Sequence, residues 1–124
     1  MAWKYFSQAE MACKCGCGEA PMDEDFMRVL DAIREDFGKP LAVSSGYRCP
    51  PHNAAVSSTG STGPHTTGCA ADVKVSGADA HRILELALQY GAMGVGVSQK
   101  GPHGSRFIHI DTIHSGNRPW IWSY

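Results

Sequence analysis

The stretch GPHTTGCAAD, residues 63–72, carries His65 and Asp72 seven positions apart, where a Gly- and Ser-rich loop runs into an apolar strand. A strand end and the loop before it can aim both side chains at one point. A neutral imidazole and a carboxylate are ligands that suit Zn²⁺. The stretch therefore predicts two ligands of a metal site, and a third has to come from elsewhere in the chain.

A second decisive stretch is FIHID, residues 107–111, in which apolar and polar residues alternate. Alternation is typical of a strand, and it places His109 and Asp111 on the same face. His109 is the best candidate for the third ligand. Two histidines and one carboxylate leave the fourth position of a tetrahedral zinc ion open for water, which is the arrangement of a catalytic zinc.

Around these stretches the sequence predicts an α+β fold. Apolar residues at helical spacing favour helices over residues 23–37 and 78–90. Short apolar runs favour strands over residues 41–44, 70–75, 94–98 and 106–111. We expect a small antiparallel sheet of about four strands with two main helices packed on it. The long polar loop, residues 46–68, is expected to bind or catalyse, because loops of that length in small domains are usually functional.

The composition predicts one domain, residues 1–124, that begins with a Cys-containing segment over residues 1–22. Eleven Lys and Arg stand against twelve Asp and Glu, and a formal charge of −1 argues against a nucleic-acid partner. No apolar run reaches the roughly 18–20 residues of a membrane span, so no membrane partner is expected. Residues 1–6 have no apolar signal core, which favours synthesis in the cytoplasm.

The five cysteines are an odd number, so they cannot all pair within one chain. Cys13, Cys15 and Cys17 form a tight cluster, and Cys49 lies far along the chain. Two interpretations stay open: a second metal site built from thiolates, or a redox-labile disulfide between Cys49 and one N-terminal cysteine. The spacing C-x-C-x-C is a poor match to zinc knuckles, whose paired cysteines are separated by more residues.

Several motifs resemble, in order, those of the zinc D-alanyl-D-alanine carboxypeptidase superfamily, to which the hedgehog signalling domain is related. Residues 45–53, SGYRCPPHN, resemble its SGYR-x-P-x-HN motif, and residues 65–72 are similar to its H-x-x-G-x-A-x-D motif. Residues 94–97 look like its G-[IV]-G strand, and residues 107–111 look like its F-[IV]-H-[IVL]-D segment. The tail RPW, residues 118–120, resembles the ending common in small phage and periplasmic peptidoglycan endopeptidases.

The resemblance implies the hedgehog/D,D-peptidase fold and one catalytic Zn²⁺ ion, held by the two histidines and the aspartate already predicted from ligand chemistry. It also implies that Arg48 lies at the substrate, with Ser45 and Tyr47 of the same motif as substrate-binding residues. An arginine there would bind a peptide carboxylate or stabilise a developing oxyanion. A structural ion pair is the alternative role of Arg48.

The general base is the part of the family pattern that this chain lacks. Several members have Glu or Asp three residues before the last histidine ligand, where this chain has Arg106. Asp111 is the nearest carboxylate, and the sequence leaves two roles open for it: general base, or a partner that holds His109 in the correct tautomer. His103, in the turn before the strand, is a third candidate for catalysis.

These observations predict a zinc metallopeptidase that hydrolyses peptidoglycan stem or cross-link peptides as a D-alanyl-D-alanine carboxypeptidase or endopeptidase, of phage or prophage origin. Two alternatives remain: an L-alanyl-D-glutamate endopeptidase on the same fold, and a non-catalytic, zinc-stabilised binding module. The expected partners are peptidoglycan peptides, and the chain is expected to be a monomer. Lacking a signal peptide, it is expected to reach the wall after release, through holin-dependent lysis or from a virion.

Overall fold

Of the two long helices, the first is capped at both ends, whereas the second begins without a side-chain cap. The computed structural model describes residues 3–124, so residues 1–2 of the predicted domain lie outside it. Helix α2 (Glu24–Phe37) begins at Asp23, whose side chain accepts a hydrogen bond from the Phe26 N–H, and ends at Gly38 in the left-handed conformation. Helix α4 (Gly77–Gln89) follows strand β2 (Ala70–Val73) along the chain. Both predicted helices are confirmed to within one residue at each end.

Five strands of the described chain form one mixed sheet. They are β1 (Val43–Ser45), β2 (Ala70–Val73), β3 (Gly94–Ser98), β4 (Phe107–Asp111) and β5 (Trp120–Ser123). Their spatial order is β1-β2-β4-β3-β5, and every pair is antiparallel except β3 with β5.

The α+β class is confirmed, but the expected antiparallel sheet of four strands is wrong in its last element. The aromatic tail forms a fifth strand, and this strand is parallel to β3. The chain leaves β4 at Asp111, which pairs with Gly94 at the start of β3. It then loops round and enters β5 at Trp120, beside Gly94 again. Because β3 and β5 start at the same end of the sheet, they run in the same direction.

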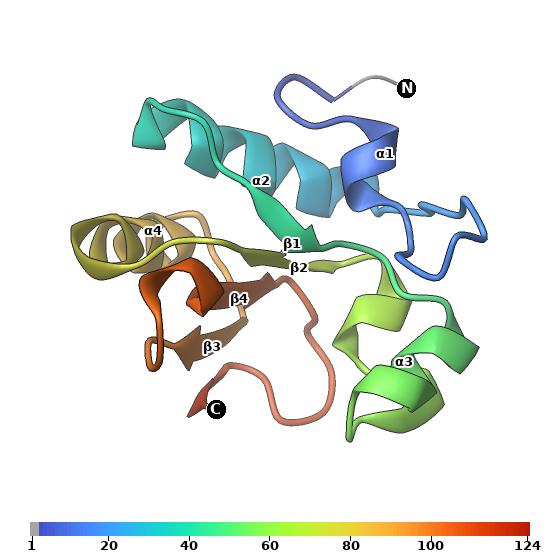
Figure 1. Cartoon of the computed structure of the whole chain (residues 1–124). Coiled ribbons are helices and arrows are strands. Elements are labelled where there is room, and N and C mark those ends of the chain that lie inside the picture. Colours follow the sequence, from blue (N-terminus) through green and yellow to red (C-terminus); the bar gives the residue numbers. More distant parts are fainter. Residues whose placement is uncertain (1–2) are drawn as a thin grey trace.

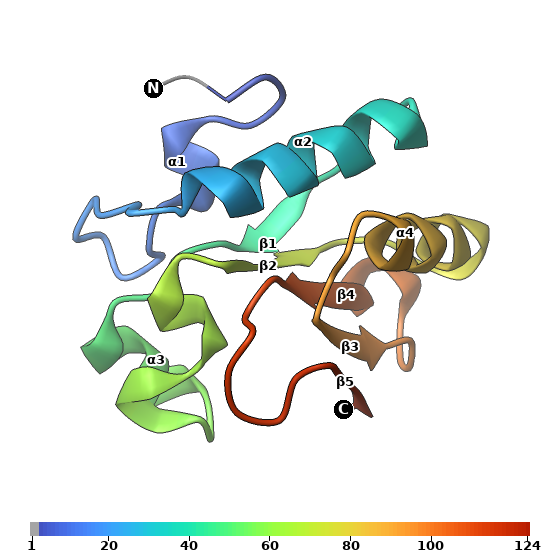
Figure 2. The same ribbon diagram turned by 180° about the vertical axis from the view of Figure 1, so that it is seen from behind.

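Alternation along the central strands gives the sheet one apolar and one polar face. On β4, Ile108 and Ile110 belong to the hydrophobic core, whereas His109 and Asp111 point to the opposite face. On β2, Asp72 also points away from the core. Figures 1 and 2 show α2 and α4 on one side of the strands, with α3 (Pro50–Val56) and the C-terminal segment on the other. The polar side chains therefore gather on the face that the two long helices leave uncovered.

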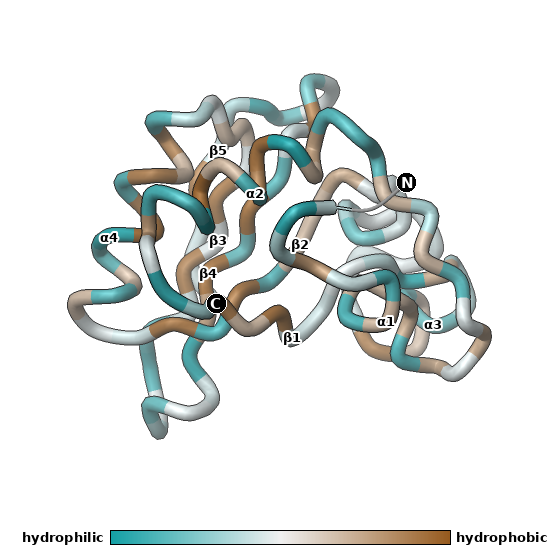
Figure 3. The backbone as a smooth tube through the Cα atoms, turned by 90° about the horizontal axis from the view of Figure 1, so that it is seen from above, coloured by the Kyte–Doolittle hydropathy of each residue, from teal (hydrophilic) through white to brown (hydrophobic). Residues whose placement is uncertain are grey.

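The core lies between the apolar face of the sheet and helices α2 and α4. Its largest fully buried side chains include Phe26, Leu30 and Ile33 of α2 and Ile83 and Leu86 of α4. Figure 3 shows hydrophobic colours along β3 and β4 and hydrophilic colours in many of the outer turns. Within residues 3–124, no helix has the length and apolar character needed to cross a membrane.

The N-terminal segment and the long loop are more ordered than the sequence predicts. The N-terminal segment forms the short helix α1 (Gln8–Met11). Residues 46–68 contain helix α3 (Pro50–Val56) and the 3₁₀ helices η1 (Gly60–Thr62) and η2 (Pro64–Thr67); a third 3₁₀ helix, η3 (His103–Ser105), precedes β4. The fully buried Asn53 amide organises the loop, since it donates to Thr59 Oγ1 and to the Gly60 carbonyl and accepts from Arg48. One buried side chain thus ties the loop to Arg48.

Gly96→Ala should destabilise the fold by displacing Trp122. A Cβ atom on Gly96 would lie 2.5 Å from Trp122 Nε1, and pairing of β5 with β3 holds that ring in place. We expect a loss of about 1–3 kcal/mol in the free energy of unfolding, the usual cost of overpacking, measured by urea denaturation. Gly104→Ala is the matched control, because a Cβ there meets no atom within 4 Å. Equal losses in the two variants would contradict this explanation.

Candidate metal centre

Three side chains that are distant in the sequence meet on the polar face of the sheet. His65 comes from η2, Asp72 from β2 and His109 from β4, and the last two are paired across neighbouring strands. His65 Nε2 lies 3.2 Å from Asp72 Oδ1, and His109 Nδ1 lies 3.0 Å from the same oxygen. All three side chains are buried, and one ligand atom of each lies within 4.8 Å of the others. The structure thus brings together the three predicted ligands.

On each imidazole ring, the hydrogen bond on the outer side indicates whether the nitrogen that faces Asp72 carries a proton. The Gly46 carbonyl only accepts, so His65 Nδ1, 2.8 Å from it, carries a proton and donates. A neutral His109 that donates from Nε2 to Asp111 Oδ2, 2.8 Å away, likewise leaves Nδ1 unprotonated. Two nitrogen lone pairs then face one carboxylate. This donor set fits a zinc ion, and both outer hydrogen bonds are of the kind that orients zinc-bound imidazoles.

The protonation of Asp72 and of His109 depends on their mutual contacts. When the ring nitrogens that face Asp72 are instead protonated, His109 and His65 donate hydrogen bonds to it. Burial alone would raise the pKa of Asp72, but these hydrogen bonds outweigh it and hold the pKa well below its usual range. Burial would lower the pKa of His109, yet hydrogen bonds to Asp111 and Asp72 raise it. Asp72 is therefore ionised at neutral pH, and a metal ion has to compete with protons for His109.

Asp111 lies on the outer side of the His109 ring. Its side chain is fully buried and receives two hydrogen bonds from Arg118, Nε to Oδ1 at 3.1 Å and Nη2 to Oδ2 at 2.8 Å. Burial would raise the pKa of Asp111, but hydrogen bonds from His109 and Arg118 lower it to about 2. Asp111 contacts Nε2, whereas Nδ1 faces the other ligands. Of its two predicted roles, the geometry favours orientation of His109 over general base.

The three ligands lie at the floor of an open cavity of about 700 Å³. One wall is the end of α3 and the residues after it, including Val56 and Ser58. The opposite wall is the C-terminal segment, including Trp120 and Tyr124. The cavity is open to solvent, so a peptide can approach the ligands between these two walls.

Arg48 lines this cavity beside a ligand. Its guanidinium donates to Ser45 Oγ at 3.1 Å and to Asn53 Oδ1 at 3.0 Å, and Nη2 lies 3.7 Å from Asp72 Oδ2. Ser45 and Tyr47 are both buried, and neither is among the cavity-lining residues. The structure therefore places Arg48 in the cavity lining beside Asp72, whereas Ser45 orients Arg48 and Tyr47 packs in the hydrophobic core.

His103 is not brought to the site. It lies in η3, is exposed, and has Nδ1 3.1 Å from Ser76 Oγ. It does not line the cavity, because the turn between β3 and β4 carries it toward the start of α4. The expectation that His103 takes part in catalysis therefore has no support in this geometry.

In the C-terminal segment, Trp122 packs beside His109 and Arg118 packs against Trp122, and residue spacing alone does not reveal these contacts. The Trp122 ring lies 5.0 Å from the His109 ring between centroids, and the Arg118 guanidinium lies 5.1 Å from the centre of the Trp122 ring. Trp122 reaches this position because β5 pairs with β3, where Gly96 leaves room for the indole. The alternating glycines of residues 94–97 were the sequence signal for this packing, because glycine in a strand often marks a place that other groups approach closely.

Two buried histidines and one aspartate, at the floor of an open cavity and beside an arginine, offer the ligand types of a catalytic zinc site. The family described as Peptidase M15 matches residues 4–111. The chain belongs to this family, which confirms the predicted relationship to the zinc D-alanyl-D-alanine carboxypeptidases. Family membership supports a zinc metallopeptidase that acts on peptidoglycan-like substrates. No curated protein sequence matches the chain.

Asp111→Asn should weaken zinc binding about 10- to 100-fold, the usual cost of losing a partner that orients a ligand. The amide cannot supply the negative charge that Asp111 presents to His109 and Arg118. Competition with a chromogenic chelator measures the affinity, and Asp25→Asn, at an exposed position of α2, is the control. If Asp111→Asn kept wild-type zinc affinity and lost only catalytic rate, Asp111 would be the base instead.

Proposed function

We propose that the protein hydrolyses amide bonds in peptidoglycan stem or cross-link peptides, as a D-alanyl-D-alanine carboxypeptidase or endopeptidase. The observation that carries this proposal is the convergence of His65, Asp72 and His109 on the floor of a cavity that Arg48 also lines. These three residues would hold the zinc ion. When bound, zinc polarises a scissile carbonyl and lowers the pKa of a coordinated water.

Arg48 supplies a fixed positive charge to the reacting centre. Its hydrogen bonds to Ser45 and Asn53 hold the guanidinium within 3.7 Å of a ligand carboxylate oxygen. A rigid cation this close to the ligands is well placed to stabilise negative charge that develops on a carbonyl oxygen. We assign Arg48 this role, in preference to binding a distant substrate carboxylate.

The non-catalytic binding module stays a second candidate because of one observation. Among the described residues that line the cavity, Asp72 has the only carboxylate side chain, and it is a predicted ligand. The other ionisable groups there are the two histidine ligands, two arginines and the Tyr124 hydroxyl, whose pKa is raised by burial. Hydrolysis therefore requires that Asp72, Tyr124 or solvent acts as the general base, which takes the proton of the attacking water. If none does, the site binds peptides without cleaving them.

The biological setting is proposed on the sequence alone, from the resemblance, the charge and the lack of a long apolar run. It comprises a phage or prophage origin, action on the cell wall after release, and a monomeric chain that binds peptidoglycan peptides without nucleic-acid or membrane partners. Zymography on walls of different chemotypes tests the target, and light scattering tests the monomer.

Zinc-loaded protein should release peptides with a new terminus from purified peptidoglycan, and His65→Ala should abolish this release because a ligand is lost. Mass spectrometry of the products, with defined stem peptides as parallel substrates, identifies the bond. A product cut after L-alanine would favour the L-alanyl-D-glutamate alternative over D-alanyl-D-alanine cleavage. Binding of these peptides by zinc-loaded protein without any cleavage would contradict the enzyme proposal and support the binding module.

Arg48→Gln should lower kcat on the cleaved peptide about 100-fold, the usual cost of losing one group that stabilises an oxyanion. KM should change much less, because the lost charge acts on the transition state. Steady-state kinetics on zinc-loaded protein measure both constants, and Arg28→Gln, at an exposed position of α2, is the control. A large rise in KM with kcat unchanged would show instead that Arg48 binds a substrate carboxylate.

A further inference from the structure

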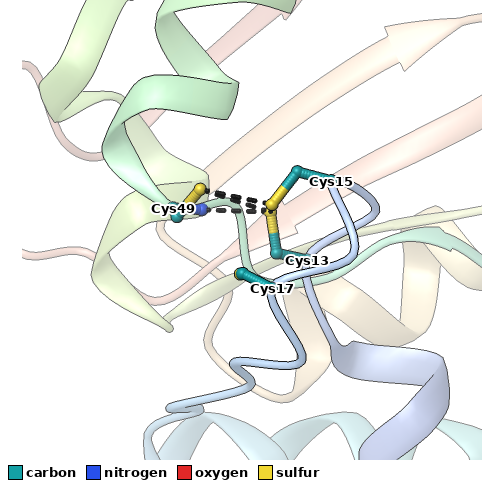
Figure 4. Close-up of side chains that lie close together, drawn as sticks. All are labelled: Cys13, Cys15, Cys17 and Cys49. Atoms are coloured by element: carbon teal, nitrogen blue, oxygen red, sulfur yellow. Dashed lines mark hydrogen bonds between the residues drawn. The ribbon is translucent and has the colours of Figure 1, made fainter.

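A second cluster of metal-binding side chains lies outside the cavity, where the N-terminal segment meets the start of α3. Cys13, Cys15, Cys17 and Cys49 place their sulfur atoms within 4.8 Å of one another. Cys13 Sγ lies 3.4 Å from Cys15 Sγ and 3.6 Å from Cys49 Sγ, and Cys15 and Cys49 are also 3.6 Å apart. Figure 4 shows the side chains of Cys13, Cys15 and Cys49 turned toward one another.

These separations have the dimensions of a metal site. A disulfide joins two sulfurs at about 2.05 Å, and all four cysteines are free. A tetrahedral zinc ion with Zn–S bonds of about 2.3 Å keeps its four sulfurs about 3.8 Å apart. The three separations of 3.4–3.6 Å are close to that value. Small shifts would therefore give tetrahedral geometry, whereas a disulfide would pull one pair much closer and leave two thiols over.

The turn after Cys13 explains how so short a spacing supplies three ligands. The backbone reverses within residues 13–19: the Gly16 N–H donates to the Cys13 carbonyl, and the Cys13 N–H donates to the Glu19 carbonyl. Gly16, with φ of 91°, adopts a backbone conformation that a residue with a side chain rarely takes. The turn places the sulfurs of alternate residues around one point, which the linear spacing C-x-C-x-C does not suggest.

The environment of Cys13 favours a thiolate. The Cys49 N–H donates to Cys13 Sγ at 3.3 Å, an interaction that stabilises negative charge on sulfur. Thiolates are the form of cysteine that binds zinc, so this geometry lowers the cost of metal binding.

We propose that Cys13, Cys15, Cys17 and Cys49 bind a second zinc ion with a structural role. Four thiolates fill a tetrahedral ion, which leaves no position for water or substrate. The ion joins the N-terminal segment to the residue that follows Arg48, next to the backbone hydrogen bond from the Tyr47 N–H to the Met11 carbonyl. It thus fixes the chain on one side of Arg48, while Asn53 and Ser45 hold the side chain. The inference does not depend on the proposed peptidase activity.

Metal counting on the whole chain, purified under reducing conditions, tests this site. Elemental analysis of the wild type should give two zinc ions per chain, and His65→Ala should retain one. Cobalt exchanged into His65→Ala should show the strong near-ultraviolet absorption of thiolate-to-cobalt charge transfer. Cys17→Ser should reduce this absorption, whereas Cys69→Ser, which changes the one cysteine outside the cluster, should leave it unchanged.

Loss of the structural ion should also weaken the fold. Zinc-free wild type should melt at a lower temperature than zinc-loaded protein, and His65→Ala should still gain stability from added zinc. One zinc ion in the wild type together with none in His65→Ala, or cobalt spectra without thiolate bands, would overturn the proposal. A disulfide between Cys49 and Cys13 or Cys15, found by mass spectrometry in the reduced preparation, would overturn it as well. None of these measurements depends on peptide cleavage.

Discussion

The structure depends on the placement of one carboxylate, Asp72, between two imidazoles on the polar face of the sheet. A buried charge is costly unless it is paired, and Asp72 is paired with His65, His109 and Arg48. The β2–β4 ladder sets the register that puts Asp72 beside His109. A slip of one residue in either strand would turn that strand's ligand toward the core. The hydrophobic pattern that builds the sheet therefore also positions the metal ligands.

The parts of the structure that follow from local chemistry could be predicted from the sequence. Helix α2 follows from its apolar spacing and its cap at Asp23, and the ligands follow from the residue types that zinc prefers. Strand β5 could not be predicted, because its partner is more than 20 residues away in sequence and nothing local marks a parallel edge strand. The role of Asp111 stayed open because a sequence does not reveal which ring nitrogen of His109 a carboxylate contacts.

The motif around Arg48 shows a second limit of sequence reasoning. Three neighbouring residues of one motif were expected at the substrate, but they serve different purposes. Arg48 lines the cavity, Ser45 holds its guanidinium, and Tyr47 packs in the core. The next residue, Cys49, turns toward the cysteine cluster. Consecutive residues thus join the cavity, the core and the N-terminal segment. The cysteine cluster, although remote from the ligands, can therefore support the position of Arg48 beside them.

The most direct test of the central claim is a crystal structure of zinc-loaded protein with anomalous difference maps from data collected on either side of the zinc absorption edge. The geometry predicts a zinc peak bounded by His65 Nε2, the Asp72 carboxylate and His109 Nδ1, with His109 Nε2 still bonded to Asp111. Absence of a zinc peak at these residues, or coordination of zinc through His109 Nε2, would contradict the assignment of the site.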